Sequence, residues 1–352
     1  MQKFGIYIHF PYCLSKCPYC DFASHACRHF DEDVLIKGYL RDLKHASFRP
    51  VSSIFFGGGT PSMLSAKAVD AIIQAIQKDF TIMPDAEITM EANPDAVDKQ
   101  KMQDFKNAGV NRLSLGVQAL NEADLKFLGR LHTLKTAICR MEEMLSVFNN
   151  CSIDLIYARP HQTINAWQKE LDFALSFKLP HLSLYELTIE EGTVFYKKGM
   201  TPCDDELARD LYLLTLDKME KANIPYYEVS NFAKKGFESQ HNLLYWQGDD
   251  YLGIGPAAHG RIGLYATQNP KDVNEWLQKG TVTEKLTPDE RKEEKIMMGL
   301  RLREGIKNDG ISEQNIQKAR DNGWIENNPK RIIPTKEGIL MLNQLTLLFL
   351  SE

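Results

Sequence analysis

Over its first two-thirds, the chain alternates short apolar runs with longer amphipathic segments. The runs are rich in β-branched and aromatic residues and lack the strict polar alternation of a strand with one face in water. Each therefore predicts a strand buried on both faces, as in a parallel sheet. The predicted strands are FGIYIHF from Phe4, SSIFF ending at Phe56, EITMEA from Glu87, RLSLGVQ from Arg112, SIDLIY from Ser152 and HLSLYELTI from His181.

Segments with helical periodicity separate these strands. Asp31 and Ser65 are suited to cap the first two of them, and Gly109 stands where the third should end. Repeated strand–helix units predict an α/β fold, either a (β/α) barrel or an open half-barrel. The predicted helices span residues 31–48, 65–80, 95–108, 134–148 and 164–177.

The pattern changes after about residue 230, which predicts three parts. Residues 1–230 form the barrel, and residues 231–285, rich in Gly, Asn and aromatics without a clear period, form an irregular extension packed on it. Residues 286–352 return to short helices around a hairpin signal, which predicts a small, mainly helical winged-helix-like domain. This last part has eleven basic and eleven acidic residues, a balance that favours a packing or partner module over a DNA-binding regulator.

Composition limits the function classes. The formal net charge is −5, so no basic excess is available for a nucleic-acid backbone, and no nucleic-acid partner is expected. No stretch approaches the roughly 20 apolar residues of a membrane span, and the N-terminus lacks the features of a signal peptide, so we expect a cytoplasmic protein that is not integral to a membrane. Seven cysteines, three of them in one eight-residue window, favour metal ligation over disulfides.

The cysteine window reads Cys13-Leu-Ser-Lys-Cys17-Pro-Tyr-Cys20. Three thiolates in a compact loop after a strand predict a [4Fe–4S] cluster in which one iron stays open for an exchangeable ligand. The alternative is zinc, which needs a fourth ligand. Nearby residues that offer one are His9, Asp21, His25 and Cys27.

Further polar residues lie where the predicted strands end. The turn Gly57-Gly58-Gly59-Thr60-Pro61 follows the second strand, and on its own it is as typical of a tight turn as of a binding loop. Because the carboxyl ends of barrel strands converge on one face, where active sites lie, we expect the following residues to meet there. They are Glu91, Gln118, Arg130 and Asp154, each of which taken alone could instead cap a helix or solvate the surface.

Six segments together resemble one family. They are IYIHFPYCLSKCPYCDF, FFGGGTPSML, RLSLGVQALNEADLKFLGRLH, LYELTIEEGT, YEVSNFAKKGFESQHNLLYW and YLGIGPAAHGR. Over nearly its whole length the chain resembles radical-SAM proteins of the oxygen-independent coproporphyrinogen III oxidase group, and within it the heme-chaperone branch. The resemblance implies a radical-SAM partial (β/α)6 barrel of the TIM type, with a [4Fe–4S] cluster, S-adenosylmethionine and heme as cofactors.

The resemblance also implies roles for individual residues. Cys13, Cys17 and Cys20 would ligate the cluster, whose electron would cleave the sulfonium of S-adenosylmethionine to give a hydrogen-abstracting radical. His241, in QHNLLYW, would bind heme, although it and, with less support, His259 fit a packing role as well. The positions implied for S-adenosylmethionine are Tyr7, Gly58, Gly59, Thr60, Glu91, Gln118, Arg130 and Asp154.

Departures from the family pattern bear on function. Phe22 stands where the decarboxylating oxidases have a further cysteine, and those oxidases have an extension before the motif. Both differences favour a chaperone that passes heme to acceptor haemoproteins such as respiratory enzymes; the alternative is the oxidase, so catalytic activity stays open. An electron donor is implied, and a homodimer is compatible. In DLIYARPHQT, Arg159 and His161 replace small residues and are expected to narrow the cofactor pocket or add a polar contact to it.

Overall fold

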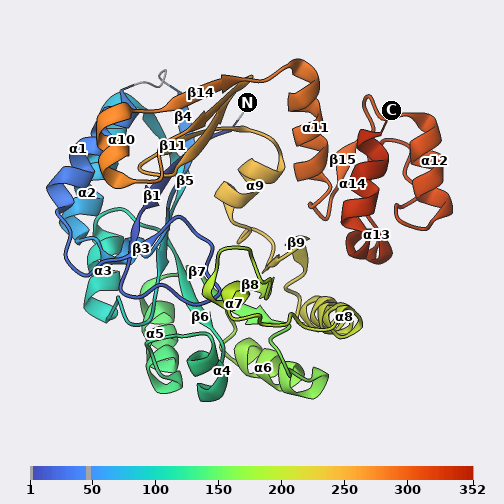
Figure 1. The fold of residues 1–352 in the computed structure, drawn as a ribbon, viewed down its shortest axis with the longest axis horizontal. Coiled ribbons are helices and arrows are strands. Elements are labelled where there is room, and N and C mark those ends of the chain that lie inside the picture. Colours follow the sequence, from blue (N-terminus) through green and yellow to red (C-terminus); the bar gives the residue numbers. More distant parts are fainter. Residues whose placement is uncertain (1–2, 45–48, 352) are drawn as a thin grey trace.

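The computed structural model describes residues 3–44 and 49–351 (Figure 1). All six predicted strands are present and pair in parallel, in chain order, within one sheet. This confirms the predicted α/β barrel-type arrangement. The strands are β1 (Phe4–Phe10), β4 (Pro50–Gly58), β5 (Thr81–Ala92), β6 (Arg112–Gln118), β7 (Asn150–Tyr157) and β8 (His181–Glu186).

The five predicted helices also form. Asp31 and Ser65 cap the first two with their side chains, as expected. The third begins later than predicted because Asp98 caps it, accepting from the amide of Lys101. These helices are α1 (Glu32–Leu43), α2 (Ala66–Asp79), α3 (Lys99–Asn107), α5 (Leu134–Val147) and α6 (Ile164–Ser176); residues 45–48 of the first prediction lie outside the described residues.

Further helices and strands were not predicted from the sequence. α4 and α7 are each less than two turns long, and α8 is a full helix after β8. The two-stranded pair β2 and β3 joins the cysteine window to the segment after it. The bounds are α4 (Glu122–Phe127), α7 (Val194–Lys197), α8 (Asp205–Lys221), β2 (Tyr12–Cys13) and β3 (His25–Ala26).

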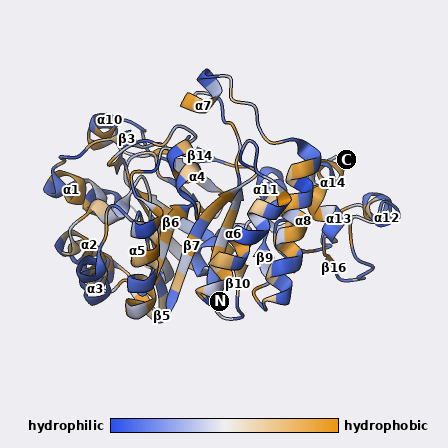
Figure 2. Ribbon diagram, turned by 90° about the horizontal axis from the view of Figure 1, so that it is seen from below, coloured by the Kyte–Doolittle hydropathy of each residue, from blue (hydrophilic) through white to orange (hydrophobic). Residues whose placement is uncertain are grey.

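The sheet separates an apolar outside from a polar inside. Ile6 and Ile8 of β1 are fully buried in the same hydrophobic cluster as Ile72 of α2, and hydrophobic residues gather along the strands in Figure 2. Because side chains alternate along a strand, intervening positions face the other way, and several of these are polar. Ser152 of β7 and His181 of β8 are such residues, joined there by a 2.7 Å hydrogen bond.

The sheet is open, as a partial barrel requires. Its strand order is β14-β13-β12-β11-β1-β4-β5-β6-β7-β8-β10-β9, so the two end strands do not pair with each other among the described residues. β11 (Asp250–Ile254) is parallel to β1, whereas β12, β13 and β14 continue antiparallel beyond it. The last strands at the other edge, β9 (Tyr226–Glu228) and β10 (Asn231–Ala233), are also antiparallel.

The description of residues 231–285 as irregular is wrong. The segment extends the sheet with short strands and adds two helices. Glycines hid this pattern: a Cβ on Gly253 would lie 2.0 Å from the carbonyl oxygen of His259, so the two backbones pack without side chains. The elements are β10, α9 (Gln240–Trp246), β11, β12 (His259–Ile262), β13 (Tyr265–Gln268), α10 (Val273–Lys279) and β14 (Val282–Lys285). The three domain boundaries stay a prediction.

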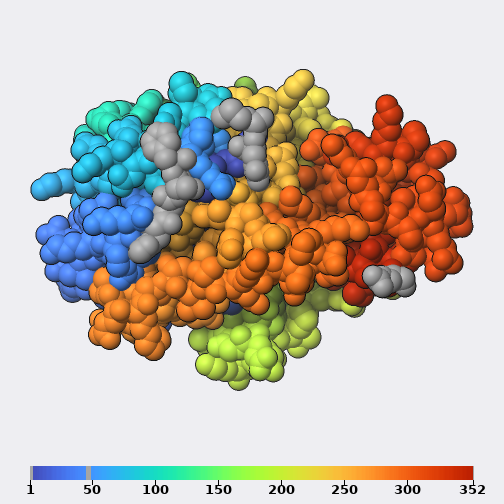
Figure 3. Space-filling view, turned by 90° about the horizontal axis from the view of Figure 1, so that it is seen from above, coloured from blue at the N-terminus to red at the C-terminus, as the bar shows by residue number. Residues whose placement is uncertain are grey.

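The C-terminal segment is mainly helical with a small antiparallel pair of strands and has a hydrophobic core of its own. It forms a lobe at one end of the molecule (Figure 3). In the described ranges, no helix is both long and apolar enough to cross a membrane. The elements are α11 (Pro288–Gly299), β15 (Ile306–Lys307), α12 (Glu313–Asp321), β16 (Arg331–Ile332), α13 (Lys336–Leu340) and α14 (Leu342–Leu350).

Candidate functional site

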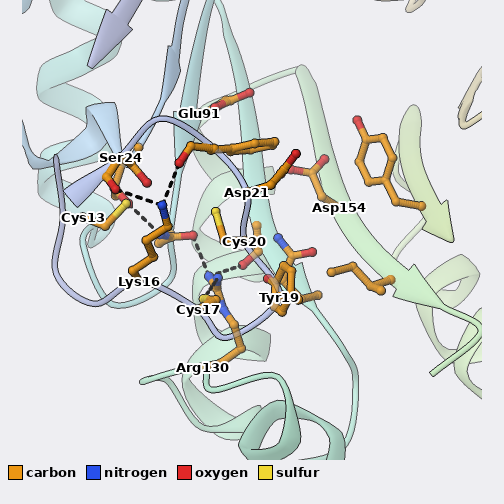
Figure 4. Close-up of a pocket in the computed structure, with 18 of the residues that line it drawn as sticks. Cys13, Lys16, Cys17, Tyr19, Cys20, Asp21, Ser24, Glu91, Arg130 and Asp154 are labelled. Carbon is orange, nitrogen blue, oxygen red and sulfur yellow. Dashed lines mark hydrogen bonds between the residues drawn. The ribbon is translucent and has the colours of Figure 1, made fainter. Parts of the chain in front are cut away.

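A cavity of about 410 Å³ opens where the parallel strands end (Figure 4). The carboxyl ends of parallel strands meet at one edge of a sheet, so residues far apart in the sequence meet there. Ten of the twelve predicted site residues line this cavity; Tyr7 and His241 do not. The ten are Cys13, Cys17, Cys20, Gly58, Gly59, Thr60, Glu91, Gln118, Arg130 and Asp154.

The loop that carries the cysteines is closed by its own hydrogen bonds. The ammonium group of Lys16 donates to the carbonyl oxygens of Phe22 at 2.9 Å and Ser24 at 3.1 Å. The β2–β3 pair and the 2.9 Å bond from the Cys27 amide to the Cys13 carbonyl complete the loop. Three free thiols are therefore presented on one braced loop at the cavity wall.

Arg130 connects this loop to two other walls of the cavity. Its Nη1 donates to Cys17 Sγ at 3.3 Å, and its Nη2 donates to Asn93 Oδ1 at 2.6 Å and to the Gly116 carbonyl at 2.9 Å. Asn93 in turn donates through Nδ2 to Thr60 Oγ1 at 2.9 Å. Asn93 was not predicted from the sequence, although its place two residues after Glu91, just past the end of β5, is a signal that points to it.

Two acids face the cavity from neighbouring strands. Burial, and after it the negative charge of Asp154, raise the pKa of Glu91 to about 8, although a hydrogen bond from the Gly58 amide and the charge of Arg112 act to lower it. Burial also raises the pKa of Asp154, opposed by hydrogen bonds from Ser183 and Ser114, the latter at 3.0 Å. A cationic ligand would reverse both shifts, so the pair suits a positively charged group.

The glycine loop, residues 57–61, packs closely against the backbone of Phe10 and Tyr12. A Cβ on Gly59 would lie 2.4 Å from the Tyr12 carbonyl oxygen. The amides of Gly59 and Thr60 donate to the carbonyls of Phe10 and Tyr12 at 2.7 and 2.8 Å. Because these two amides are used inside the protein, the loop is better suited to accept from an ammonium group through carbonyl oxygens than to donate to a carboxylate.

A strained residue completes the wall. Gln118 has a φ of +71°, and the register between β6 and β7 shifts between Gly116 and Gln118. Such a bulge redirects a side chain, and left-handed non-glycine residues are concentrated at functional sites. A Cβ on Gly116 would lie 2.9 Å from both Asn93 Oδ1 and Gln118 Nε2, so a larger residue there would force one of these side chains to move.

Three thiols on one loop match the donor set of an iron–sulfur cluster. Among the described residues, no three His, Cys, Asp or Glu side chains converge in a way that would hold one metal ion. Ser24 and Arg130 line the cavity, and a buried polar atom of each, Ser24 Oγ and Arg130 Nε, lacks a protein partner among the described residues, as at a site that a bound group completes.

Comparison with known proteins places the chain in a family. The Radical SAM superfamily profile covers residues 7–174, and the HemN C-terminal domain profile covers residues 286–341. Heme chaperone HemW of Buchnera aphidicola subsp. Schizaphis graminum is 32% identical, with 100% of this chain and 99% of that protein covered. The chain belongs to the HemW family. Heme chaperone HemW of Bacillus subtilis is 33% identical, with coverage of 98% and 99%.

A solved structure shares the fold. Coproporphyrinogen III oxidase (HemN) from Escherichia coli, described as a radical SAM enzyme, has a TM-score of 0.84 to the chain. The match covers 99% of this chain and 90% of that chain at 19% sequence identity. The likeness therefore confirms the predicted fold class and extends it to the C-terminal segment.

The HemW segment around His241 forms α9, which lies against the sheet interior. His241 is fully buried, and burial lowers its pKa to about 3, so its ring is neutral. Nδ1 lies 2.8 Å from Ser53 Oγ, and Nε2 lies 2.8 Å from the Tyr245 hydroxyl. With both ring nitrogens engaged, this arrangement favours the packing role over heme ligation. His259 is exposed at the start of β12.

Tyr7 lies next to His241, outside the cavity lining. Its ring stacks on that histidine at 6.3 Å and on Phe55 at 6.2 Å between centroids. His9 Nε2 lies 2.9 Å from the Ala23 carbonyl, to which it must donate, so His9 Nδ1 accepts from the Tyr7 hydroxyl at 3.1 Å. Tyr7 thus reaches the cysteine loop through His9.

The expectation that Arg159 and His161 narrow the pocket of this HemW chain is wrong. Arg159 is 1% exposed and is not part of the cavity wall. It forms an ion pair with Glu170 of α6, lies 3.0 Å from Asp124 of α4 and donates to the Ile156 carbonyl at 2.9 Å. A buried guanidinium needs such partners, and they draw Arg159 away from the cavity. His161 is exposed, with a φ of +66°.

Proposed function

We propose that the protein is a heme chaperone that binds heme and transfers it to acceptor haemoproteins. The observation that carries the proposal is sequence identity along the full chain with proteins named heme chaperone HemW. Phe22 supports it from the structure: it lines the cavity, with 59% of its surface exposed, where the decarboxylating oxidases have a cysteine.

We further infer that the cavity holds a [4Fe–4S] cluster and S-adenosylmethionine. Cys13, Cys17 and Cys20 would hold the cluster, which supplies one-electron chemistry to a sulfonium when both groups are bound. The chain's own part is electrostatic. Glu91 and Asp154 would attract a cation into the cavity, and the hydrogen-bonded loops around it would fix the orientation of that cation.

The alternative function is oxygen-independent coproporphyrinogen III oxidation. The fold of HemN supports the shared scaffold but no particular substrate. Anaerobic incubation of cluster-loaded protein with coproporphyrinogen III, S-adenosylmethionine and a reductant separates the two functions. We expect no vinyl-bearing product by chromatography; turnover at a rate comparable with that of a HemN control would overturn the chaperone proposal.

Heme capture and transfer test the chaperone function directly. Cluster-loaded protein should take up heme stoichiometrically in an absorbance titration and pass it to an apo-haemoprotein on mixing. If neither uptake nor transfer exceeds that of an unrelated protein of similar size, the proposal fails.

Variants of His241 and of its neighbour Tyr245 test the role of His241. If the residue only packs α9, His241→Ala reduces stability and leaves heme affinity unchanged. If it ligates heme after α9 moves, His241→Ala weakens capture, and Tyr245→Phe, which frees Nε2, strengthens it. His259→Ala is the matched control, because that histidine is exposed and belongs to β12 instead of α9.

We also place the protein in the cytoplasm. The seven cysteines are all free thiols, as a reducing compartment maintains them. Acceptor haemoproteins and an electron donor are the partners that the proposed function requires, and a homodimer is compatible with it. Sedimentation of the cluster-loaded protein with and without heme measures the oligomeric state.

A further inference from the structure

One amide side chain joins three separate parts of the cavity. Asn93 donates to Thr60 of the glycine loop and accepts from Arg130, whose guanidinium also contacts Gly116 of β6 and the sulfur of Cys17. Asn93 itself lines the cavity just past the end of β5. Its position decides where the guanidinium lies relative to the cysteine loop.

The chemistry of this contact matters because Asn93 is neutral. A carboxylate at the same place would also accept from Arg130, and it could accept from the Thr60 hydroxyl. The connection between Thr60 and Arg130 would therefore be kept. The carboxylate would, however, cancel the positive charge beside Cys17. Asp95 acts on Arg130 electrostatically, but its carboxylate is paired with His132, Oδ1 to Nδ1 at 3.5 Å. The guanidinium is therefore free of a direct carboxylate partner among the described residues.

We propose that Arg130, positioned by Asn93, raises the reduction potential of the cluster that Cys17 ligates. The inference rests on the cluster assignment made under the proposed function. Reduction by an external donor adds one electron to the cluster and makes it more negative, without breaking a bond. A cation that donates N–H to a ligand sulfur stabilises the reduced form more than the oxidised form, because hydrogen bonds and net charge near the sulfurs set cluster potentials.

The effect on the reduction potential comes specifically from the contact between Arg130 and Cys17. Nη1 lies 3.3 Å from Cys17 Sγ, whereas the ammonium group of Lys16 is bound to the carbonyls of Phe22 and Ser24. Tyr19 also contacts Cys17, but as a neutral phenol whose pKa burial raises. Arg130 is thus the side chain that brings a full positive charge to a cluster-loop sulfur by a direct hydrogen bond in the described structure.

The test is an anaerobic redox titration of the cluster without S-adenosylmethionine, followed by the EPR signal of the reduced form. We expect Asn93→Asp, Arg130→Lys and Arg130→Met all to shift the midpoint potential to more negative values. Arg130→Lys should shift it least, because it keeps the charge but loses the fork that spans Cys17 and Asn93. An unchanged potential in Asn93→Asp and Arg130→Met would overturn the proposal. Asn93 would then serve only to connect Thr60 and Arg130.

The matched control is Asn107→Asp. It makes the same chemical change at the exposed end of α3, where the new carboxylate can still accept from Gln103, and it lies outside the cavity wall. We expect no shift there; a shift as large as that of Asn93→Asp would also overturn the proposal. Iron content and heme capture are measured on every variant. Iron bound and heme captured without a potential shift refutes this inference only, whereas wild-type protein that binds no iron refutes the proposed function.

Discussion

Replacing Glu91 by glutamine should stabilise the empty protein in mild alkali. Burial raises the pKa of this carboxyl from 4.5 to about 8, so the folded protein holds a proton that the unfolded chain releases at lower pH. A group with a raised pKa in the folded state contributes stability below its unfolded pKa, and that stability is lost as pH rises through the folded value. The loss between pH 5 and pH 9 is about 4 kcal/mol, at 1.36 kcal/mol for each of the roughly three pH units between pH 5 and the folded pKa.

The assay compares urea unfolding of wild type and Glu91→Gln at pH 5 and at pH 9. Groups that do not interact with Glu91 titrate equally in both proteins, so the difference between the two free energies of unfolding reports Glu91 together with its coupled neighbour Asp154. We expect near equality at pH 5 and a more stable variant by several kcal/mol at pH 9. Gln118→Asn, a neutral change in the same cavity, should shift stability equally at both pH values. A Glu91→Gln difference that does not change with pH would refute the reasoning.

The same change should act oppositely on ligand binding. A cation in the cavity needs the ionised carboxylate, so wild-type affinity for S-adenosylmethionine should fall about tenfold per pH unit below pH 8, once the pH dependence of Glu91→Gln is subtracted. Equilibrium binding at pH 6.5, 7.5 and 8.5 measures this. Affinity that is equally pH-dependent in both proteins would show that Glu91 does not meet the cation. If the affinity instead falls as expected, the carboxylate of Glu91 lowers the stability of the empty protein and strengthens ligand binding, a common cost at functional sites.

Three further outcomes follow from the geometry. Arg159→Ala should lower the free energy of unfolding by about 3–5 kcal/mol, because Glu170 is left charged and buried, and Arg159→Met with Glu170→Met should recover most of it in urea titrations. Gly59→Ala should reduce iron bound per chain after reconstitution, because the new Cβ meets the Tyr12 carbonyl at 2.4 Å. Ser53→Ala should destabilise the fold by about 1–3 kcal/mol in thermal unfolding, since a buried ring nitrogen of His241 loses its partner.

Much of the site could be predicted from strand order alone. Once six strands were predicted to run parallel, the residues at their carboxyl ends had to converge, which placed Glu91, Gln118 and Asp154 correctly. Asn93 was not predicted, because an Asn-Pro pair after a strand is typical of a turn and its role depends on where Arg130 reaches. The helix α9 was missed because its seven residues are too few to show a helical period.

Local chemistry in the sequence determined the six parallel strands, the five helices between them and the group of three thiols. These depend on neighbours in the chain: hydrophobic period, capping residues and a loop short enough to hold its cysteines together. Side-chain direction was decided by tertiary partners. Glu170 and Asp124 draw Arg159 away from the cavity, and Ser53 and Tyr245 occupy both nitrogens of His241. A buried polar group must be satisfied by whatever lies beside it in space, and that neighbour is not written next to it in the chain.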